Sequence, residues 1–314
     1  MKLTSKAASI VFASVVLSAA MTMGEYPATR PARAAPAQSK FLRFVPDNHG
    51  GGTLQASIVR YVNDDGVIVD LVSAVHIAEP SFFQQLDDSF TDYDAVLYEM
   101  VSPKEGEPPP TTQRSMIWLG RFQRGLRDAL DLSFQLEEID YKRPNFVHAD
   151  MDLGAFQQMQ AERKESFLSM AFASAAHNMD NPRAAAAQPN PIELLAALTA
   201  PDRPRRLKLI MARTMGAMGD SLGGMDGPRG SVIISERNKV ALQRLSQQIA
   251  DGKKTLAIFY GAGHFRSMEK TLTEEMGFRQ VGPPMWRIAW DMSTHLPHPA
   301  TRPATGPSTV PAHG

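Results

Sequence analysis

The sequence contains no cysteine among its 314 residues. Disulfide bonds, thiolate zinc sites, a cysteine nucleophile and a lipid anchor on cysteine are therefore excluded. Any metal site has to use His, Asp and Glu side chains, which favours zinc, manganese, iron or cobalt over copper(I) or an iron–sulfur cluster.

The chain also lacks an excess of charge, since 33 Lys and Arg residues balance 33 Asp and Glu residues. This balance gives no indication of nucleic-acid binding. Two motifs are missing as well. No G-x-S-x-G of a serine hydrolase occurs, and the glycine-rich stretch GDSLGGMDGPRGS lacks the GK[ST] ending of a phosphate-binding loop. A serine hydrolase and a nucleotide-binding protein are both disfavoured.

Long apolar runs are absent outside the N-terminus. There MKLTSK precedes AASIVFASVVLSAAM, a pattern typical of a signal peptide and short for a spanning helix. Cleavage is expected near Ser18–Ala20 or Ala32–Ala35. An uncleaved anchor is the alternative and the only membrane contact expected. We predict a signal peptide and disordered leader over 1–38, a disordered Pro-rich tail over 295–314, and a protein exported to the periplasm or cell surface.

A folded domain is predicted over residues 39–294, where short β-rich runs alternate with helical patterns. Two such runs flank the hairpin signal NDDG, a helix begins at Pro80, and AVLYEM is the next strand, which makes a βαβ unit with parallel strands. Further strands are expected at NFVHAD, TLAIFYGAGH and MWRIAWDM, and an all-helical insertion at about 151–225. We therefore predict an α/β fold with a mixed, largely parallel sheet and flanking helices.

Polar side chains follow four of the predicted strands: His76, Glu99, His148 with Asp150, and His264. The carboxyl ends of parallel strands form the crevice in which α/β proteins bind ligands. Two imidazoles and one or two carboxylates suit a divalent metal ion, or a metal-free acid–base pair. Each residue alone also fits a structural role, such as a hydrogen-bonded histidine or a helix cap at Asp150.

The turn GAGH before the last predicted helix adds two glycines to this edge. Gly261 and Gly263 permit a tight turn and a close approach of the backbone to a ligand. The following helix would aim its free N–H groups at an anion or a developing oxyanion. The alternative is a plain strand-to-helix turn in which the glycines serve only packing.

The stretch SERNKVALQRL places Glu236 and Arg237 at the start of another predicted helix. Arg237 would bind a substrate carboxylate or orient Glu99, and Glu236 would accept a proton. The alternative is a capping arrangement, with Ser235 as the cap and Glu236 beside the helix dipole.

These motifs resemble the TraB/GumN (PrgY, TIKI-like) family. The resemblance rests on VDLVSAVHIAEPSFFQQLDDSFTDYDAVLYEM, SERNKVALQRL and YGAGHFRSMEKTL, which follow one another from about Gly52 to Trp290. It implies a fold like that of the erythromycin-esterase and ChaN groups, and metal-dependent peptidase-like activity. One departure from the family pattern is SAVH, where Ser73 replaces the usual glycine.

Carried over by position, the resemblance implies an active centre of His76, Glu99 and His264, supported by Arg237. We therefore expect an exported metal-dependent hydrolase that acts on a peptide or a small amide or ester. His76 and His264 would ligate a divalent ion (Mn, Co, Zn or Fe), and Glu99 would act as ligand or general base. The alternatives are a non-catalytic peptide-, haem- or metal-binding protein of the same fold, and a metal-free esterase.

Overall fold

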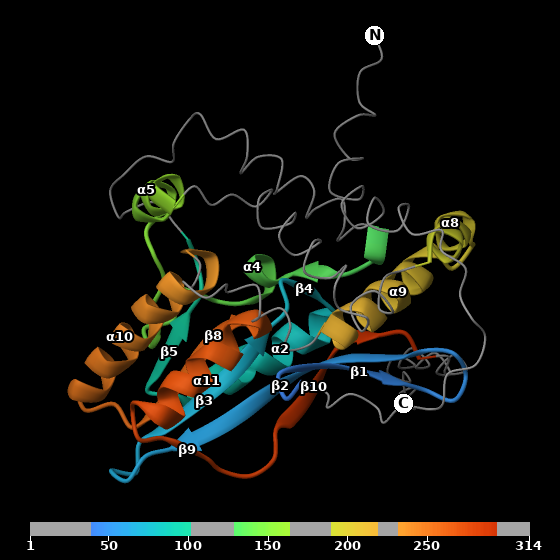
Figure 1. Ribbon diagram of the computed structural model, residues 1–314. Helices are drawn as coiled ribbons and strands as arrows, with labels where there is room; N and C mark the ends of the chain where they lie inside the picture. Colours follow the sequence, from blue (N-terminus) through green and yellow to red (C-terminus); the bar gives the residue numbers. More distant parts are fainter. Residues whose placement is uncertain (1–38, 102–128, 164–189, 219–231, 294–314) are drawn as a thin grey trace, which may run out of the picture.

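The computed structural model describes residues 39–101, 129–163, 190–218 and 232–293 (Figure 1). The predicted signal peptide, leader and Pro-rich tail lie outside the described residues, as do the glycine-rich stretch and parts of the predicted insertion. Within the described residues, no helix has the length and apolar character that crossing a bilayer requires.

One eight-stranded sheet forms the centre of the fold. Its main order is β1-β2-β3-β8-β5-β7, and β9 and β10 also pair with β2. The strands are β1 (Leu42–Pro46), β2 (Gly52–Val62), β3 (Ile68–Ala74), β5 (Ala95–Tyr98), β7 (Phe146–His148), β8 (Thr255–Gly261), β9 (Arg279–Gln280) and β10 (Met285–Asp291).

Strand directions confirm the predicted mixed, largely parallel sheet. The pairs β3–β8, β8–β5 and β5–β7 are parallel, whereas β1, β3, β9 and β10 each pair with β2 antiparallel. It follows that β2 alone runs against the other seven strands. The predicted hairpin joins β2 to β3, and Gly66 in its turn has the positive φ of 73° that favours glycine.

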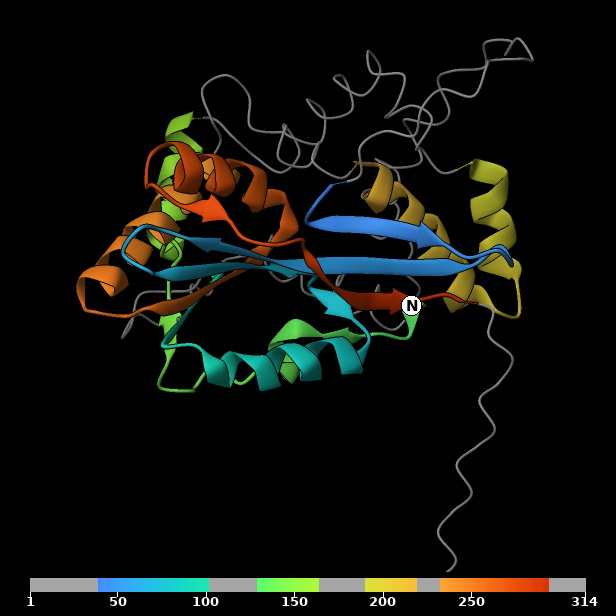
Figure 2. The ribbon, with the colours of Figure 1, turned by 90° about the horizontal axis from the view of Figure 1, so that it is seen from below.

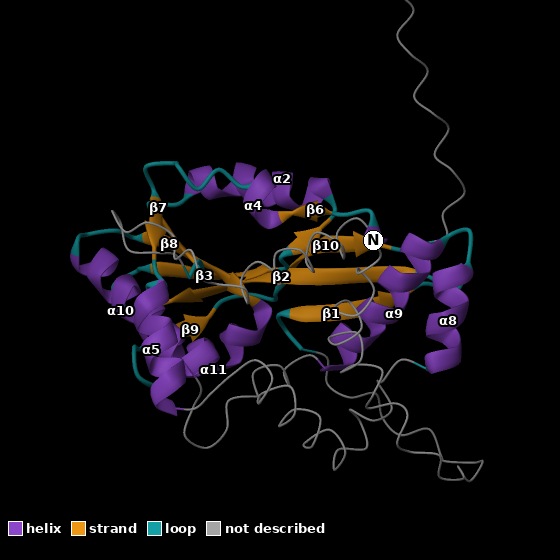
Figure 3. Cartoon of the chain, turned by 90° about the horizontal axis from the view of Figure 1, so that it is seen from above, coloured by secondary structure: helices purple, strands orange, loops and turns teal. Residues whose placement is uncertain are grey.

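Helices cover both faces of the sheet (Figures 2 and 3). On one face lies α2 (Pro80–Ser89), which starts at Pro80 as predicted and buries Phe82, Phe83 and Leu86. On the other face lie α10 (Arg237–Ala250) and α11 (Phe265–Glu274), which bury Leu245 and Leu272 with Val69 and Leu71 of β3. Buried strands with apolar residues on both faces are expected where helices cover a sheet on both sides.

The described parts of the predicted insertion form α5 (Leu153–Arg163), α8 (Pro191–Thr199) and α9 (Arg203–Met218). Asp152 accepts a hydrogen bond from the N–H of Ala155 and so caps α5. Helix α9 packs on β1 and contributes Leu207 and Ile210 to the main core. This helix is therefore a structural part of the domain.

Short elements complete the edge of the sheet at which β3, β5, β7 and β8 end. They are β4 (Ile77–Ala78), β6 (Ser133–Phe134), α4 (Gln135–Glu138), the π-helical turn η3 (Val232–Glu236) and η4 (Ala262–His264). The short helix η1 (Phe90–Asp92) lies at the opposite edge, just before β5 begins. Strand β4 pairs with β6, which ties the chain after His76 to α4.

Candidate functional site

The carboxyl ends of the four parallel strands lie next to one another. Tyr98 at the end of β5 pairs with Phe259 of β8 on one side and with His148 of β7 on the other, and Ala74 at the end of β3 pairs with Gly261. The predicted polar residues therefore start from one edge of the sheet. Which of them come into contact depends on the direction of each side chain.

Glu99, Arg237 and Asp150 form a buried network of charges at this edge. Nη2 of Arg237 donates to Oε1 of Glu99 at 2.7 Å and to Oδ2 of Asp150 at 2.6 Å, and Nε donates to Oδ1 of Asp150 at 2.8 Å. The side chain of Asp150 has no exposed surface. Arg237 thus orients Glu99, one of its two predicted roles, and is itself held by Asp150.

His264 lies beside Glu99, with Nε2 3.7 Å from Oε1 of the carboxylate. Its other nitrogen, Nδ1, is 2.6 Å from Oδ1 of Asn238, while the amide nitrogen of Asn238 donates to the carbonyl oxygen of His264 at 3.1 Å. Because the amide nitrogen is used on that carbonyl, Oδ1 faces the ring and Nδ1 must be the protonated nitrogen. Nε2 is then left as an acceptor that faces Glu99.

Burial and neighbouring charges together set the protonation states of this pair. Burial by itself raises the pKa of the Glu99 carboxyl, but the positive charges of His264 and Arg237, with the N–H of Gly261, outweigh it and lower this pKa to about 2. Burial also lowers the pKa of His264 to about 4, although the negative charge of Glu99 opposes this shift. At neutral pH the site therefore contains a carboxylate next to a neutral imidazole.

Gly261 contacts the carboxylate directly, because its N–H donates to Oε2 of Glu99 at 2.6 Å. A Cβ atom at this position would lie 3.3 Å from Oε2 and 3.9 Å from the ring of His264. The sequence predicted a close approach of this backbone to a ligand, and in the structure the backbone of Gly261 approaches Glu99. Gly263 lies within η4, the turn that carries His264.

His76 follows β3 at the same edge, but its side chain is exposed to solvent. Its charge adds to those of His264 and Arg237 in lowering the pKa of Glu99, so the imidazole lies within electrostatic reach of the carboxylate. The structure thus places His76 near the pair without packing it against either member.

Two predicted residues point elsewhere. Nε2 of His148 is 2.6 Å from the carbonyl oxygen of Met100, and its ring packs edge-on against Tyr98. Glu236 pairs with Arg163 of α5 and with Lys239. These contacts give His148 and Glu236 structural roles beside the site, so the prediction of Glu236 as a proton acceptor finds no support in its contacts.

Sequence reasoning missed Asn238. Its only signal was an uncharged polar residue directly after Arg237 in a predicted helix, which does not distinguish a buried position from a solvated one. In the structure Asn238 is 3% exposed. It follows η3, a π-helical turn, and such turns occur often at functional sites.

His264 and Glu99 fit two ligands of a divalent metal ion. A metal-binding histidine commonly donates its second ring N–H to an oxygen, as His264 does to Asn238. Within the described ranges, however, no three His, Asp or Glu side chains are placed closely enough to hold an ion. For His76, the third ligand predicted from the sequence, to join them, its exposed side chain would have to turn toward the pair.

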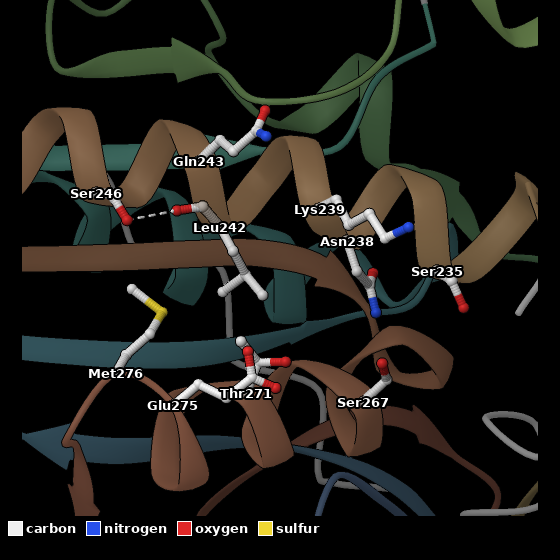
Figure 4. Close-up of a pocket in the computed structure, with 10 residues that line it drawn as sticks. All are labelled: Ser235, Asn238, Lys239, Leu242, Gln243, Ser246, Ser267, Thr271, Glu275 and Met276. Atoms are coloured by element: carbon white, nitrogen blue, oxygen red, sulfur yellow. Dashed lines mark hydrogen bonds between the residues drawn. The ribbon is translucent and has the colours of Figure 1, made fainter.

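A groove of about 460 Å³ runs between α10 and α11 (Figure 4). Asn238 lines its end near the site, while Ser246, Glu275 and Met276 line the far end. None of the site residues predicted from the sequence lines this groove. We therefore place the candidate site at the strand ends.

Comparisons of the chain with protein-family models, with curated proteins and with solved structures found no match. The family resemblance thus stays a prediction from the sequence motifs, and the functional conclusion below rests on the geometry of the site.

Proposed function

We propose that the chain is an exported, metal-dependent hydrolase that acts on a peptide or a small amide or ester, as its resemblance to the TraB/GumN family implies. The contact between His264 and Glu99 carries the proposal. A neutral imidazole lies 3.7 Å from an anionic carboxylate in a buried position at the ligand-binding edge of an α/β sheet. Titratable groups with strongly perturbed pKa values cluster at functional sites.

The chain's own residues have distinct roles in this proposal. Glu99 accepts a proton from the attacking water, since its carboxyl is unprotonated at neutral pH. Arg237 and the N–H of Gly261 hold the carboxylate in place, and Asn238 keeps Nε2 of His264 free of its proton.

The metal ion would be held by His264 and His76, with Glu99 as a further ligand or as the general base. When bound, a divalent ion polarises a carbonyl group and lowers the pKa of water to roughly 7. The orientation of His264 by Asn238 supports this part of the proposal, since it leaves a lone pair on Nε2.

A metal-free hydrolase is the second candidate, and one observation favours it. Of the three predicted metal ligands, Glu99 and His264 lie within 4 Å of each other, whereas His76 is exposed. In that case Glu99 or His264 would accept a proton directly from the attacking water, since both are unprotonated at neutral pH, and would return it to the leaving group.

The test uses the purified full-length chain, loaded in turn with Mn²⁺, Co²⁺ and Zn²⁺ and incubated with an internally quenched peptide library. We expect cleavage by the wild type and a loss of at least about 100-fold in His264→Ala and His76→Ala. His49→Ala, at an exposed histidine in the β1–β2 turn, is the matched control and should cleave normally.

The outcomes separate the candidates. Cleavage that survives prolonged treatment with EDTA and o-phenanthroline favours the metal-free hydrolase. If no metal supports cleavage and the histidine variants still bind peptide, the chain is a binding protein and the hydrolase proposal is wrong.

A further inference from the structure

Helix α8 carries a row of apolar side chains that faces away from the core. Ile192, Leu195 and Leu198, called here the apolar row, are 77%, 65% and 43% exposed. Their spacing of three residues places them along one side of the helix. The other side is fixed to the domain, because Ala197 is buried and Leu194 packs against the main core. The packing of α8 therefore directs the apolar row outward.

Three arginines of α9 lie beside α8. Arg205, Arg206 and Arg213 line a groove of about 340 Å³, the arginine groove, together with Ala196 of α8. Ala196 is next to Ile192 on the helix surface, since the two are four residues apart, so the groove borders the apolar row. The side chains of Arg206 and Arg213 are 51% and 46% exposed. Solvent-accessible positive charge therefore flanks the apolar row.

The described α8–α9 hairpin is basic, although the whole chain has no net charge. It carries four arginines and Lys208 against two acidic residues, Glu193 and Asp202. The acidic residues pair with Arg213 and Arg206 at the surface, where such pairs contribute little and are screened by salt. Lys208 is buried and pairs inside the domain. The arginines thus give the outer side of the hairpin an excess of positive charge.

We infer that the α8–α9 hairpin binds the surface of an anionic lipid membrane. The apolar row enters the boundary between headgroups and acyl chains, and the arginine groove binds lipid phosphates. Exposed apolar residues rimmed by polar ones are typical of interaction surfaces, and a guanidinium can donate two parallel hydrogen bonds to one phosphate. This contact is additional to the predicted N-terminal segment and does not depend on the proposed hydrolase function.

A second copy of the chain fits this surface less well than a membrane does. In a two-fold dimer the same patch meets itself, so the arginines around the apolar row of one copy would approach those of the other. Like charges brought together at an interface cost free energy. An anionic lipid surface instead supplies the opposite charge around the whole row. Charge complementarity therefore favours the membrane.

The test uses a label at a single position, which is possible because the chain has no cysteine. Leu195→Cys in the full-length chain carries an environment-sensitive fluorophore, and vesicles of phosphatidylcholine, alone or mixed with phosphatidylglycerol, are added. We expect a blue shift with the mixed vesicles, and binding to the neutral ones that is at least about 10-fold weaker. High salt should weaken the binding to mixed vesicles.

Val281→Cys carries the control label, at an apolar residue 46% exposed in the connection from β9 to β10. Its emission should not change with either kind of vesicle. Because each label reports its own position, membrane contact through the N-terminal segment alone would leave both labels unchanged.

Charge variants of the labelled chain test the arginine groove. Arg206→Gln combined with Arg213→Gln should weaken binding to mixed vesicles about 30-fold, since one basic residue near an anionic surface contributes roughly fivefold. Arg244→Gln combined with Arg266→Gln removes the same charge from α10 and α11, and α10 lies at the opposite end of the sheet from α8 (Figures 1 and 3). This control pair should leave the affinity within about threefold of the wild type, because salt screens charges distant from the lipid.

A Leu195 label that does not respond to mixed vesicles overturns the inference, as does equal binding to neutral and mixed vesicles or an equal loss in the two pairs of arginine variants. A blue shift without vesicles that grows with protein concentration, together with a dimer in sedimentation, would assign the surface to a second copy and reject the membrane. A response to soluble inorganic phosphate as large as that to vesicles would identify a site for free anions and reject it too.

Discussion

At the scale of single residues, Arg237 decides the geometry of the site. Its guanidinium joins Glu99 to Asp150, and both carboxylates are almost fully buried. Burying these three charges costs free energy, and their mutual attraction offsets this cost only while all three remain paired. A buried charge without a partner destabilises the fold far more than a buried pair does.

Replacing Arg237 should therefore destabilise the fold. We expect Arg237→Met to lower the free energy of unfolding at neutral pH by about 3–5 kcal/mol, since two buried carboxylates would lose their shared cation. Urea unfolding measures the change. Arg244→Met, on the exposed side of the same helix, should stay within about 0.5 kcal/mol of the wild type. Equal effects of the two substitutions would refute a role for the buried network.

Part of this site was predictable from the sequence by two simple rules. A strand that ends in a polar residue is visible as an apolar run before His76 or Glu99, and parallel strands bring such ends to one edge. The partners of each side chain were not predictable. The pairing of Asn238 with His264 depends on how α10 is rotated against η4, and packing sets that rotation.

At the scale of secondary-structure elements, an ion pair links β2 to β3 within the sheet. Asp70 of β3 is fully buried and accepts two hydrogen bonds from Arg60 of β2, at 2.9 and 2.8 Å. The hydroxyl of Tyr93, just after η1, donates to the same carboxylate at 2.7 Å. Asp70 thus connects both strands of the hairpin to the chain just after η1.

Asp70→Asn tests this link. The amide nitrogen of asparagine is a donor and would face the donors of Arg60 and Tyr93, so we expect a loss of about 1.5–3 kcal/mol in unfolding free energy. Asp64→Asn is the matched control, because the Asp64–Arg279 pair is exposed and should contribute less than about 1 kcal/mol. Urea denaturation of both variants gives the comparison, and a loss no larger than that of Asp64→Asn would show that the hairpin does not depend on Asp70.

The order of the strands could not be read from the chain. The βαβ pattern correctly predicts that β3 and β5 run in the same direction, yet β8 lies between them and pairs with both. β8 comes about 180 residues later than β3. Periodicity and turn signals report local structure only, and they do not specify which distant strand completes a sheet.

At the scale of the whole molecule, the buried pair makes folding depend on pH. His264 has its pKa lowered from 6.5 to about 4, so the folded state favours the neutral ring. Its contribution to stability is complete above about pH 6.5 and is lost as the pH falls toward 4. Glu99, lowered from 4.5 to about 2, contributes above about pH 4.5 and loses its effect below that.

The metal-free chain should therefore lose stability in two successive steps on acidification, and His264 accounts for the first. A pKa difference of this size corresponds to at most ~3 kcal/mol between about pH 6.5 and pH 4. Urea unfolding at several pH values, with EDTA present, measures the slope. His264→Gln cannot be protonated, so its stability should be nearly independent of pH in this interval, whereas His49→Gln, at an exposed position, should follow the wild type. His264 resists protonation because it is buried, although the charge of Glu99 opposes this effect. Equal slopes in His264→Gln and the wild type would therefore mean that the ring is open to water and that the buried site does not form.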